Sequence, residues 1–377
     1  MSAPVVVHFI ETDIPGGAES FLFDLCIEQR ACGLRPMIGH FRHPWFEQRC
    51  RETDIESFDL PDRARFKKVA ALPGFALDFA RRLRRAGTQL LHSHLFGPIV
   101  GGSLTALLGR IPHVGTLHDI HMVQEVPSRI RQLKVALALG TRLVAVSNQM
   151  NEFYRQRVTW RKDRILTIHN GIRPVRIEAP VTRESLSIAQ DALVLICVGR
   201  LIPLKRVQDA IQALHAIGGS IPATLVVVGE GPEMPRLQGL AAQLGVADRV
   251  RFLGARRDVP ALLRVADLFL QCSDTEGLSM SIIEALHAGL PCIVTQVGGN
   301  PELVHQDENG ALYRHSDVAA LTARVTRLAQ NPELRRQMGE RSRQSAQRDF
   351  TIEACTEKYV SLYRRLGLQP HTTYAPK

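Results

Sequence analysis

The sequence lacks the features that define several common classes of protein. It has no run of about eighteen apolar residues, so no segment is predicted to span a membrane. The N-terminal stretch MSAPVVVHFIETD has no basic region before its apolar run, so we expect no signal peptide. The seven cysteines form no C-x-x-C pair, which favours a reducing compartment. Together these absences favour a cytoplasmic protein.

Motifs for common cofactors and for nucleic acids are also missing. There is no G-x-G-x-x-G fingerprint and no P-loop lysine motif, which argues against NAD-dependent and P-loop enzymes. Aromatic residues make up only 6% of the chain, and no nucleic-acid-binding motif is found. We therefore expect no nucleic-acid partner, and keep a basic nucleic-acid-binding module only as a distant alternative.

The chain is nevertheless basic, with a formal net charge of +10. Residues 1–172 carry 23 Lys and Arg against 16 Asp and Glu, whereas residues 173–377 carry 24 against 21. A basic first half favours an anionic partner, such as an acidic lipid surface, a phosphorylated substrate or nucleic acid. A bias towards solubility explains the same excess.

Short apolar runs alternate with longer amphipathic stretches along the chain. The runs are nearly continuous in Val, Ile and Leu, as in parallel strands that are buried on both faces. The strands predicted from them are 4–10, 89–94, 113–118 and 142–147, followed by 192–199, 223–229, 249–254, 267–272 and 291–296. Repeated β-α-β units of this kind predict an α/β protein with right-handed crossovers.

One interruption divides this pattern. Residues 171–191 hold two prolines and no apolar period, and a new strand follows. We predict two Rossmann-like, doubly wound domains, 1–172 and 173–350, that face each other across a cleft. Residues 351–377 are predicted to form a helix that crosses back to the first domain, with a frayed tail after about residue 366. In such sheets, ligands bind at the carboxyl ends of the strands.

Glycines and cations follow several of the predicted strands. Gly16 and Gly17 open a helix behind the first strand, where free amides would meet an anion or simply form a turn. Arg200 and Lys205 follow the strand that opens the second domain, and form either a clamp for a diphosphate or a solvated pair. Gly229, in the motif GEGP, resembles half of a dinucleotide fingerprint, although a tight turn explains it equally well.

Two glutamates stand close together in the stretch SDTEGLSMSIIEALHAGLP. Glu276 lies in a predicted loop, and Glu284 lies in a helix predicted to begin near Ser279. Eight residues of ideal helix rise ~12 Å, whereas paired glycosidase carboxylates stand about 5–9.5 Å apart. We therefore expect the two glutamates to hold different parts of one ligand, with the amides of Leu278, Ser279 and Met280 on a phosphate between them. The alternative is one capping carboxylate and one that faces solvent.

Taken together, these motifs resemble the retaining glycosyltransferases of the GT-B fold, family 4. The resemblance rests on GGAE, TLHD, VSN, HNGI, GRLIPLK, GEGP, EGLSMSIIEAL, VGGNPELV and NGALY, in this order. It covers nearly the whole chain, and its most specific part is G-R-x-x-x-x-K followed by E-x7-E. It implies a hexosyl- or N-acetylhexosaminyl-transferase that uses a nucleotide-sugar, with UDP favoured, in cell-surface polysaccharide synthesis. The first domain would bind the acceptor and the second the nucleotide-sugar.

The resemblance also implies roles for individual residues. Arg200 and Lys205 match the pair that binds the donor diphosphate. Glu276 matches a glutamate that touches the donor sugar near the reaction centre, and Glu284 matches one that holds the ribose hydroxyls. His118, in TLHD, matches a histidine close to the transferred sugar.

The expected chemistry depends on negative charge. Cleavage of a nucleotide-sugar leaves a diphosphate anion, and stabilising that anion is the main catalytic task. The resemblance assigns Gly16 and Gly17 to the diphosphate, and the GEGP motif adds Gly229 to the nucleotide site. No D-x-D motif occurs, so we expect no cofactor and no essential divalent metal. No enzymic nucleophile is evident, which fits front-face attack with retention.

Residues 62–87 are the candidate segment for the acceptor side. Their basic residues bracket an apolar middle, which would lie on an anionic membrane and meet a polyprenyl-diphosphate-linked sugar. An ordinary solvated helix is the alternative. The first interpretation predicts a peripheral protein at the cytoplasmic face of the membrane, and the second predicts no membrane contact by this segment.

Two alternatives concern metals and the type of reaction. His92 with His94, and His118 with His121, are spaced like pairs of metal ligands, but no cysteine or carboxylate cluster accompanies them. We expect no metal there, and we expect His92 and His94 to line the cleft or to cap its mouth. A GT-B-like sugar-nucleotide epimerase or hydrolase is the alternative enzyme, and it would turn over the nucleotide-sugar without an acceptor.

Overall fold

The structure is a computed structural model that describes residues 3–13, 16–158, 160–174, 177 and 179–369. The chain divides into two compact units. Unit 1 comprises Met1–Arg173 and Ile352–Lys377, and unit 2 comprises Pro174–Thr351. The predicted boundaries are 172 and 350, and most of the predicted frayed tail lies outside the described residues.

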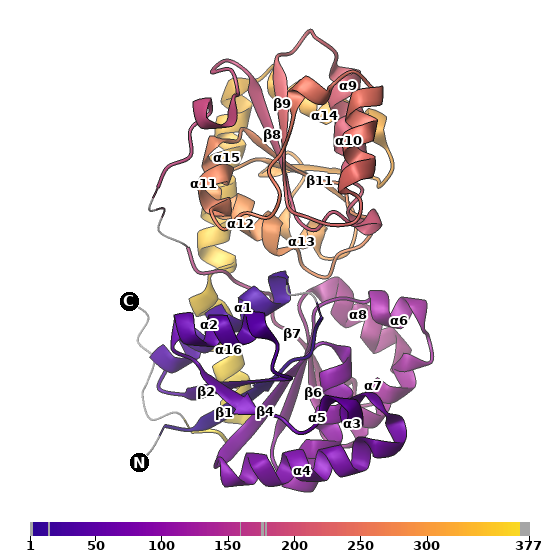
Figure 1. The fold of residues 1–377 in the computed structure, drawn as a ribbon, viewed down its shortest axis with the longest axis vertical. Coiled ribbons are helices and arrows are strands. Elements are labelled where there is room, and N and C mark those ends of the chain that lie inside the picture. Colours follow the sequence, from indigo (N-terminus) through magenta and orange to yellow (C-terminus); the bar gives the residue numbers. More distant parts are fainter. Residues whose placement is uncertain (1–2, 14–15, 159, 175–176, 178, 370–377) are drawn as a thin grey trace. The chain divides into compact units, whose positions relative to one another are not determined.

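Unit 1 is built on a seven-stranded sheet with the order β3-β2-β1-β4-β5-β6-β7 (Figure 1). All neighbouring strands pair in parallel, and the order reverses between β1 and β4. The strands are β1 Val5–Phe9, β2 Arg35–His40, β3 Glu56–Asp59, β4 Thr88–His94, β5 His113–Leu117, β6 Arg142–Ala145 and β7 Ile165–Thr167. The α-helices are α1 Gly17–Ala31, α2 Pro44–Thr53, α3 Arg63–Lys67, α4 Leu72–Arg85, α5 Phe96–Gly109, α6 His121–Glu125, α7 Arg129–Ala138, α8 Asn148–Arg157 and α16 Ile352–Arg365.

Unit 2 has a six-stranded parallel sheet with the order β10-β9-β8-β11-β12-β13. Its order reverses between β8 and β11. The strands are β8 Leu193–Val198, β9 Ala223–Val228, β10 Val250–Phe252, β11 Leu268–Gln271, β12 Cys292–Thr295 and β13 Gly310–Tyr313. The α-helices are α9 Val207–Ile217, α10 Met234–Gln243, α11 Val259–Val265, α12 Met280–Ala288, α13 Asn300–Leu303, α14 Val318–Ala329 and α15 Pro332–Asp349.

The predicted α/β class is confirmed, and all nine predicted strands are present. Four further strands, β2, β3, β7 and β13, have no counterpart in the prediction. Three of these, β3, β7 and β13, lie at sheet edges, where one side of the strand is unpaired and a continuous apolar run is not needed. The fourth, β2, has the sequence RPMIGH, in which proline and glycine interrupt the strand pattern.

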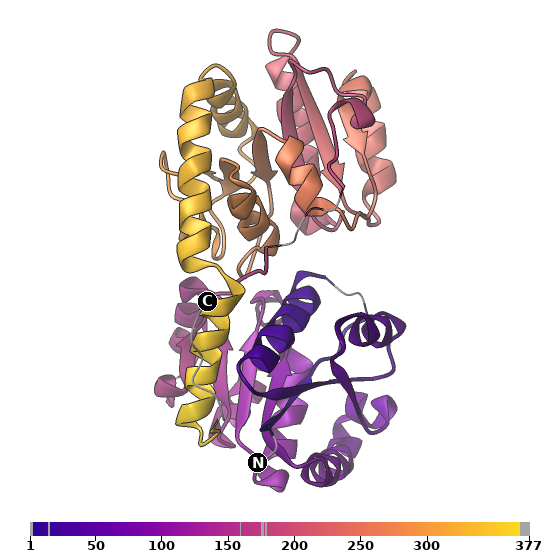
Figure 2. The ribbon, with the colours of Figure 1, turned by 90° about the vertical axis from the view of Figure 1, so that its left-hand side faces the viewer.

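Helix α16 completes unit 1, although the helix before it, α15, belongs to unit 2 (Figure 2). It packs against α1, and its entry is fixed by a backbone hydrogen bond of 3.0 Å from Ile352 N–H to the Ile172 carbonyl. Two of its tyrosines, Tyr359 and Tyr363, are fully buried. Among the helices that the structure describes, none combines the length and apolarity needed to cross a membrane.

Candidate functional site

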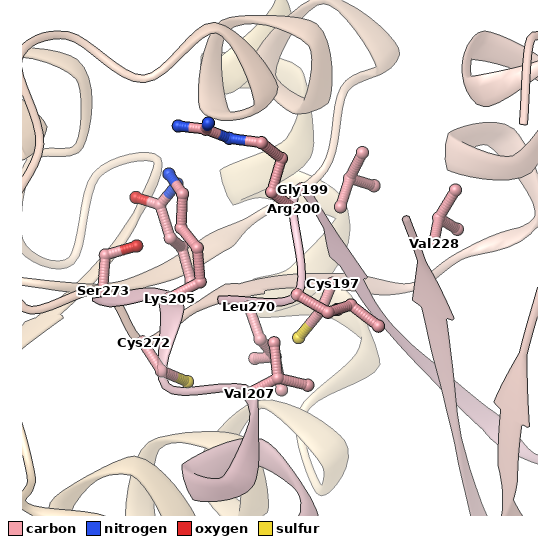
Figure 3. Close-up of a pocket in the computed structure, with 12 residues that line it drawn as sticks. Cys197, Gly199, Arg200, Lys205, Val207, Val228, Leu270, Cys272 and Ser273 are labelled. Atoms are coloured by element: carbon pink, nitrogen blue, oxygen red, sulfur yellow. The ribbon is translucent and has the colours of Figure 1, made fainter. Parts of the chain in front are cut away.

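Unit 2 has a pocket at the carboxyl ends of β8 and β11, where the order of its sheet reverses. Ligands of open α/β sheets bind at this position. Figure 3 shows the long side chains of Arg200 and Lys205 on one side of the strand ends, with the thiol groups of Cys197 and Cys272 on the other. Two cations therefore border the pocket, while the thiols belong to the apolar core beneath it.

Lys205 and Glu276 form an ion pair beside this pocket. The Lys205 ammonium donates a hydrogen bond of 2.6 Å to Glu276 Oε1. The Lys205 side chain is 24% exposed and that of Glu276 is 10% exposed, so the pair is largely withdrawn from water. Charges in such surroundings are screened less than surface charges. The structure thus brings together two of the predicted residues that are 71 positions apart.

The pocket also contains polar atoms without partners. Ser273 Oγ and Gln271 Oε1 are both buried and have no hydrogen-bond partner in the described part of the chain. An unpaired buried polar group costs about 1–3 kcal/mol, so each such group in a native structure calls for an explanation.

The loop between β11 and α12 offers further donors. Ser279 is the N-cap of α12, and its hydroxyl accepts from Ile282 N–H and from the Gln271 side-chain amide, at 3.4 and 2.7 Å. No described residue accepts from the backbone amides of Leu278, Ser279 and Met280. Backbone amides at the start of a helix attract anions. The predicted phosphate contact at these three amides stays a prediction.

Glu284 lies in the second turn of α12 and is half-buried. The structure corrects the spacing argument, because the helix begins only at Met280. The residues from Glu276 to Ser279 are not helical, so the rise of an eight-residue helix does not describe the separation of the two glutamates. The predicted ribose contact of Glu284 stays a prediction.

Two glycines of unit 2 are required by close backbone approach. Gly229 has φ +134°, and a Cβ there would lie 1.9 Å from the Gly199 carbonyl oxygen, directly before Arg200. Gly298 has φ +53°, and its Cβ would lie 1.8 Å from the Glu276 carbonyl oxygen. Gly229 thus has a packing reason of its own, and its predicted nucleotide contact is untested. Gly298 was not among the predicted site residues, although it belongs to the motif VGGNPELV.

In unit 1, His118 follows β5 and is half-buried. Its Nε2 lies 3.4 Å from His94 Nδ1, and its ring lies edge-on to that of Phe21 in α1, with the ring centroids 6.0 Å apart. Burial lowers the pKa of His118 to about 4, so the imidazole is neutral near pH 7. A second pocket is lined by Leu95, Phe96, Leu117, His118, Asp119, Met122, Val123 and Tyr154.

One backbone amide of the predicted glycine loop in unit 1 already has a hydrogen-bond partner within the chain. Gly16 is the N-cap of α1, and its N–H donates to Glu19 Oε2 at 2.8 Å, in a capping box. The Gly16 amide therefore has a partner within its own capping box in this structure, and the predicted diphosphate contact of Gly16 and Gly17 stays a prediction. Gly17 is the first residue of the helix, and the two residues that precede Gly16 lie outside the described residues.

The expectation that His92 and His94 line a cleft or cap its mouth is wrong, because both are fully buried in unit 1. The sheet brings them beside His8 of β1, and ring nitrogens of the three lie within 4.8 Å of one another. All six ring nitrogens have protein partners, so the rings need no metal to satisfy them. His121 instead lies 3.0 Å from Glu125. The expected absence of a metal stays a prediction.

The apolar side chains of segment 62–87 lie partly in the core of unit 1 and partly at its surface, where Val69 is 87% exposed. The segment forms α3 and α4, and Phe75, Phe79 and Leu83 pack into the core of unit 1. Several of its basic side chains have acidic partners, including Arg63 and Lys67, which both pair with Glu11 at 2.5–2.6 Å. Part of the apolar middle of this segment thus belongs to the core of unit 1, and membrane contact through the segment stays a prediction.

Two doubly wound units, with a cation-bordered pocket at the switch point of the second, define the GT-B class of fold. Solved structures agree: the crystal structure of Anabaena Alr3699/HepE in complex with UDP and glucose matches with a TM-score of 0.84 and 21% identity, over 96% of this chain and 100% of that chain. At this identity the likeness shows the fold alone.

Sequence comparison shows the family. The model of glycosyl transferases group 1 matches residues 179–345, and that of glycosyltransferase family 4 matches residues 15–176. The N-acetyl-alpha-D-glucosaminyl L-malate synthase of Bacillus anthracis is 32% identical over 307 residues, which cover 78% of this chain and 80% of the relative. The UDP-Gal:alpha-D-GlcNAc-diphosphoundecaprenol alpha-1,3-galactosyltransferase of Escherichia coli is 26% identical over 329 residues, 83% of this chain and 84% of the relative. The chain belongs to the group 1, family 4 glycosyltransferases.

Proposed function

We propose that this glycosyltransferase retains the anomeric configuration and moves a hexose or N-acetylhexosamine from a UDP-sugar to a glycan acceptor carried on a polyprenyl diphosphate. Its place would be cell-surface polysaccharide synthesis, in the cytoplasm or at the cytoplasmic face of the membrane. The observation that carries the proposal is the pocket of unit 2. It combines Arg200, the Lys205–Glu276 pair, two buried polar atoms without a partner among the described residues, and the backbone amides of residues 278–280, from which no described residue accepts.

These groups suit the departure of a diphosphate. Arg200 is exposed and offers a planar fork of donors, while Lys205 offers a point charge. When a diphosphate binds, Lys205 would be shared between a phosphate oxygen and Glu276, and the amides of 278–280 would complete the cradle. Stabilisation of the negative charge that develops on the leaving group lowers the barrier.

Glu276 is the proposed partner of the donor sugar. Its carboxylate is held in place by Lys205, and its second oxygen is available to accept from a sugar hydroxyl. The bond between the anomeric carbon and the diphosphate breaks, the acceptor oxygen bonds to that carbon from the same face, and the acceptor proton passes to a diphosphate oxygen. No divalent metal is required in this scheme. Glu284 is the proposed partner of the ribose.

The names of the relatives support UDP as the donor nucleotide. The Anabaena structure contains UDP and glucose, and the E. coli relative is named for UDP-Gal and a diphosphoundecaprenol acceptor. The B. anthracis relative is named for transfer to L-malate, and its identity over most of the chain favours a second candidate, a small hydroxy acid. The two candidate acceptors differ in size and in the need for a membrane.

A thermal-shift screen with UDP, GDP, ADP and their sugars tests the donor. A nucleotide that binds only the folded state raises the melting temperature, so UDP and a UDP-sugar should give the largest shift. Transfer assays with a lipid-linked sugar and with a hydroxy acid then identify the acceptor, and NMR of the product shows whether the configuration is retained. Stabilisation by none of the nucleotides would end the proposal, and turnover without an acceptor would favour an epimerase or hydrolase.

A variant tests the role of Glu276. Glu276→Gln keeps the size but removes the charge, so kcat should fall by about 100-fold, the range seen when one transition-state contact is lost. The affinity for UDP should change by less than about threefold, because the base and phosphates do not depend on this carboxylate. Glu333→Gln, at an exposed ion pair in α15, is the matched control. Equal loss of UDP affinity and kcat would contradict the assignment.

A further inference from the structure

A chain of hydrogen bonds runs through the interior of unit 1 and ends at His118. In α1, the Gln29 side-chain amide donates to the Tyr363 hydroxyl of α16 at 3.1 Å, and its Oε1 lies 2.8 Å from His8 Nε2. His8 Nδ1 lies 3.0 Å from His94 Nε2, and His94 Nδ1 lies 3.4 Å from His118 Nε2. Four elements, α1, α16, β1 and β4, thus contribute one side chain each before His118.

Solvent does not reach the side chains of this hydrogen-bond chain, so it cannot supply or remove their protons. Gln29, His8, His94 and Tyr363 are all completely buried. Burial lowers the pKa of His8 to about 4 and that of His94 well below its usual value, so both rings are neutral. A neutral imidazole has one donor and one acceptor nitrogen. The nitrogen that carries the proton in one imidazole therefore fixes which nitrogen carries it in the next. The hydrogen bonds can consequently all point one way along the series or all point the other way.

The orientation of the Gln29 amide selects one direction. The Tyr363 oxygen lies 2.7 Å from His92 Nδ1 and 3.1 Å from Gln29 Nε2. The amide nitrogen of Gln29 can only donate, so the Tyr363 oxygen accepts from it. The single hydrogen of the Tyr363 hydroxyl is then donated to His92 Nδ1. This orientation turns the Gln29 carbonyl oxygen towards His8.

The remaining protons follow from this start. His8 donates from Nε2 to Gln29, so its Nδ1 accepts from His94 Nε2–H. His94 Nδ1 then accepts from His118 Nε2–H, and His118 Nδ1 is left with a lone pair. No described residue hydrogen-bonds to His118 Nδ1, and His118 lines the second pocket of unit 1. The nitrogen that remains available is an acceptor and not a donor.

We propose that Gln29, His8 and His94 are positioning residues that hold His118 with its proton on Nε2, so that Nδ1 accepts a hydrogen bond from a hydroxyl of the bound sugar. The identity of the ligand rests on the proposed function, whereas the position of the proton does not. The arrangement selects ligands that carry a hydroxyl at this point. An analogue with hydrogen, an ether or a carboxylate there has no hydrogen to donate.

Two variants at Gln29 separate the positioning role from a role in packing. Gln29→Met preserves the volume but removes the acceptor for His8, so the direction of the chain is no longer imposed. Gln29→Glu keeps an acceptor for His8 and should keep the direction at His118. His113→Asn is the control. His113 is another fully buried histidine, but its hydrogen bonds go to Thr141 and Ser93, which are not part of the hydrogen-bond chain that leads to His118.

The readout is ¹⁵N NMR of the imidazole nitrogens in histidine-labelled protein, with the His118 signals identified from His118→Gln. We expect His118 to be protonated on Nε2 in the unmodified chain, in Gln29→Glu and in His113→Asn. We expect a mixture of the two forms in Gln29→Met. Protonation on Nδ1 in the unmodified chain, or an unchanged His118 in a folded Gln29→Met, would overturn the proposal.

Kinetics then test the contact with the sugar. One neutral hydrogen bond contributes about 1 kcal/mol, so Gln29→Met should lower kcat/KM by about 5- to 10-fold, with Gln29→Glu restoring most of the loss. A nucleotide-sugar that lacks the contacted hydroxyl should have a low kcat/KM, and this value should be the same with Gln29→Met and with Gln29→Glu. If the NMR outcome holds and kcat/KM does not change, the sugar contact is wrong. If no donor is turned over at all, the proposed function fails and the NMR outcome still stands.

Discussion

The two units place polar side chains at the same topological position and treat them in opposite ways. At the switch point of unit 2, Lys205 and Glu276 are charged and partly exposed, and neighbouring polar atoms have no partner among the described residues. At the switch point of unit 1, the histidines of β1 and β4 are neutral, fully buried and bonded through every ring nitrogen. The same fold thus supplies a charged surface for an anion in one unit, and a fixed direction of hydrogen bonds in the other.

The largest expected effect follows from the buried histidines. In unit 1, burial lowers the pKa of six histidines below the ordinary value of about 6.5: His8, His40, His92, His94, His113 and His118. The unfolded state therefore binds more protons than the folded state between about pH 4 and 6.5, so stability is lost as the pH falls through this window. Asp24, whose pKa burial raises to about 6, opposes this trend with a single group.

We expect unit 1 to lose roughly 5 kcal/mol of stability between pH 7.5 and 5.5, since each histidine contributes up to about 1.4 kcal/mol per pH unit. The histidines of unit 2 are half-buried or exposed, so unit 2 should be less affected. Both tryptophans, Trp45 and Trp160, lie in unit 1, so urea unfolding followed by fluorescence reports on that unit, and circular dichroism reports on both. Equal shifts of the two transitions with pH would break the comparison.

The next effect concerns the charge in unit 2. Lys205→Ala removes a cation from the pocket and leaves Glu276 without its partner, so UDP affinity should fall by about 10- to 100-fold, the equivalent of 1.5–3 kcal/mol for a bond to a charged group. Titration calorimetry measures the affinity. Lys205 is the single lysine in residues 174–351, so UDP should also protect one peptide of unit 2 from an amine-reactive label.

The control for Lys205 is Arg256→Ala, which breaks an exposed pair with Asp258 in the same unit. Exposed pairs contribute about 0–1 kcal/mol, so this change should leave UDP binding nearly unaltered. Unchanged UDP affinity in Lys205→Ala would show that the charges of unit 2 serve stability and not the ligand. The charged side chains of unit 2 would then not distinguish it from unit 1 as the unit that binds the anion.

The smallest expected effect is at Tyr363. Tyr363→Phe leaves His92 Nδ1 and the Gln29 amide buried without a partner, and should cost about 1–3 kcal/mol in urea unfolding. Thr88→Val is the control in the same sheet, because the Thr88 hydroxyl is buried without a partner among the described residues. If both changes cost the same, the hydrogen bonds of unit 1 contribute no more than packing does.

Much of the fold follows from local pattern. Strands such as LVLICV and ATLVVV are buried on both faces, and this burial requires the continuous apolar runs from which they are predicted. Edge strands such as β3, with the sequence ESFD, have no such requirement and leave no comparable signal. The position of the unit 2 pocket follows from the rule that ligands bind at strand ends, because Arg200 and Glu276 lie in the loops that follow β8 and β11.

The polar interior of unit 1 could not be predicted in the same way. His8 is a single histidine inside the run VVVHF, and nothing local shows that β4 will lie beside it and present His92 and His94. Tyr363 lies 271 positions from its partner His92, at the far end of the chain. Such contacts depend on strand order and on the return of α16, which are properties of the whole fold.

The return of α16 has a consequence for how the protein is made. Unit 2 is one continuous stretch, whereas unit 1 needs residues that are synthesised after unit 2. During translation, the first 173 residues therefore emerge before the helix that brings Tyr359 and Tyr363 to their histidines. Unit 2 can therefore fold completely before unit 1 does, although most of unit 1 is synthesised first.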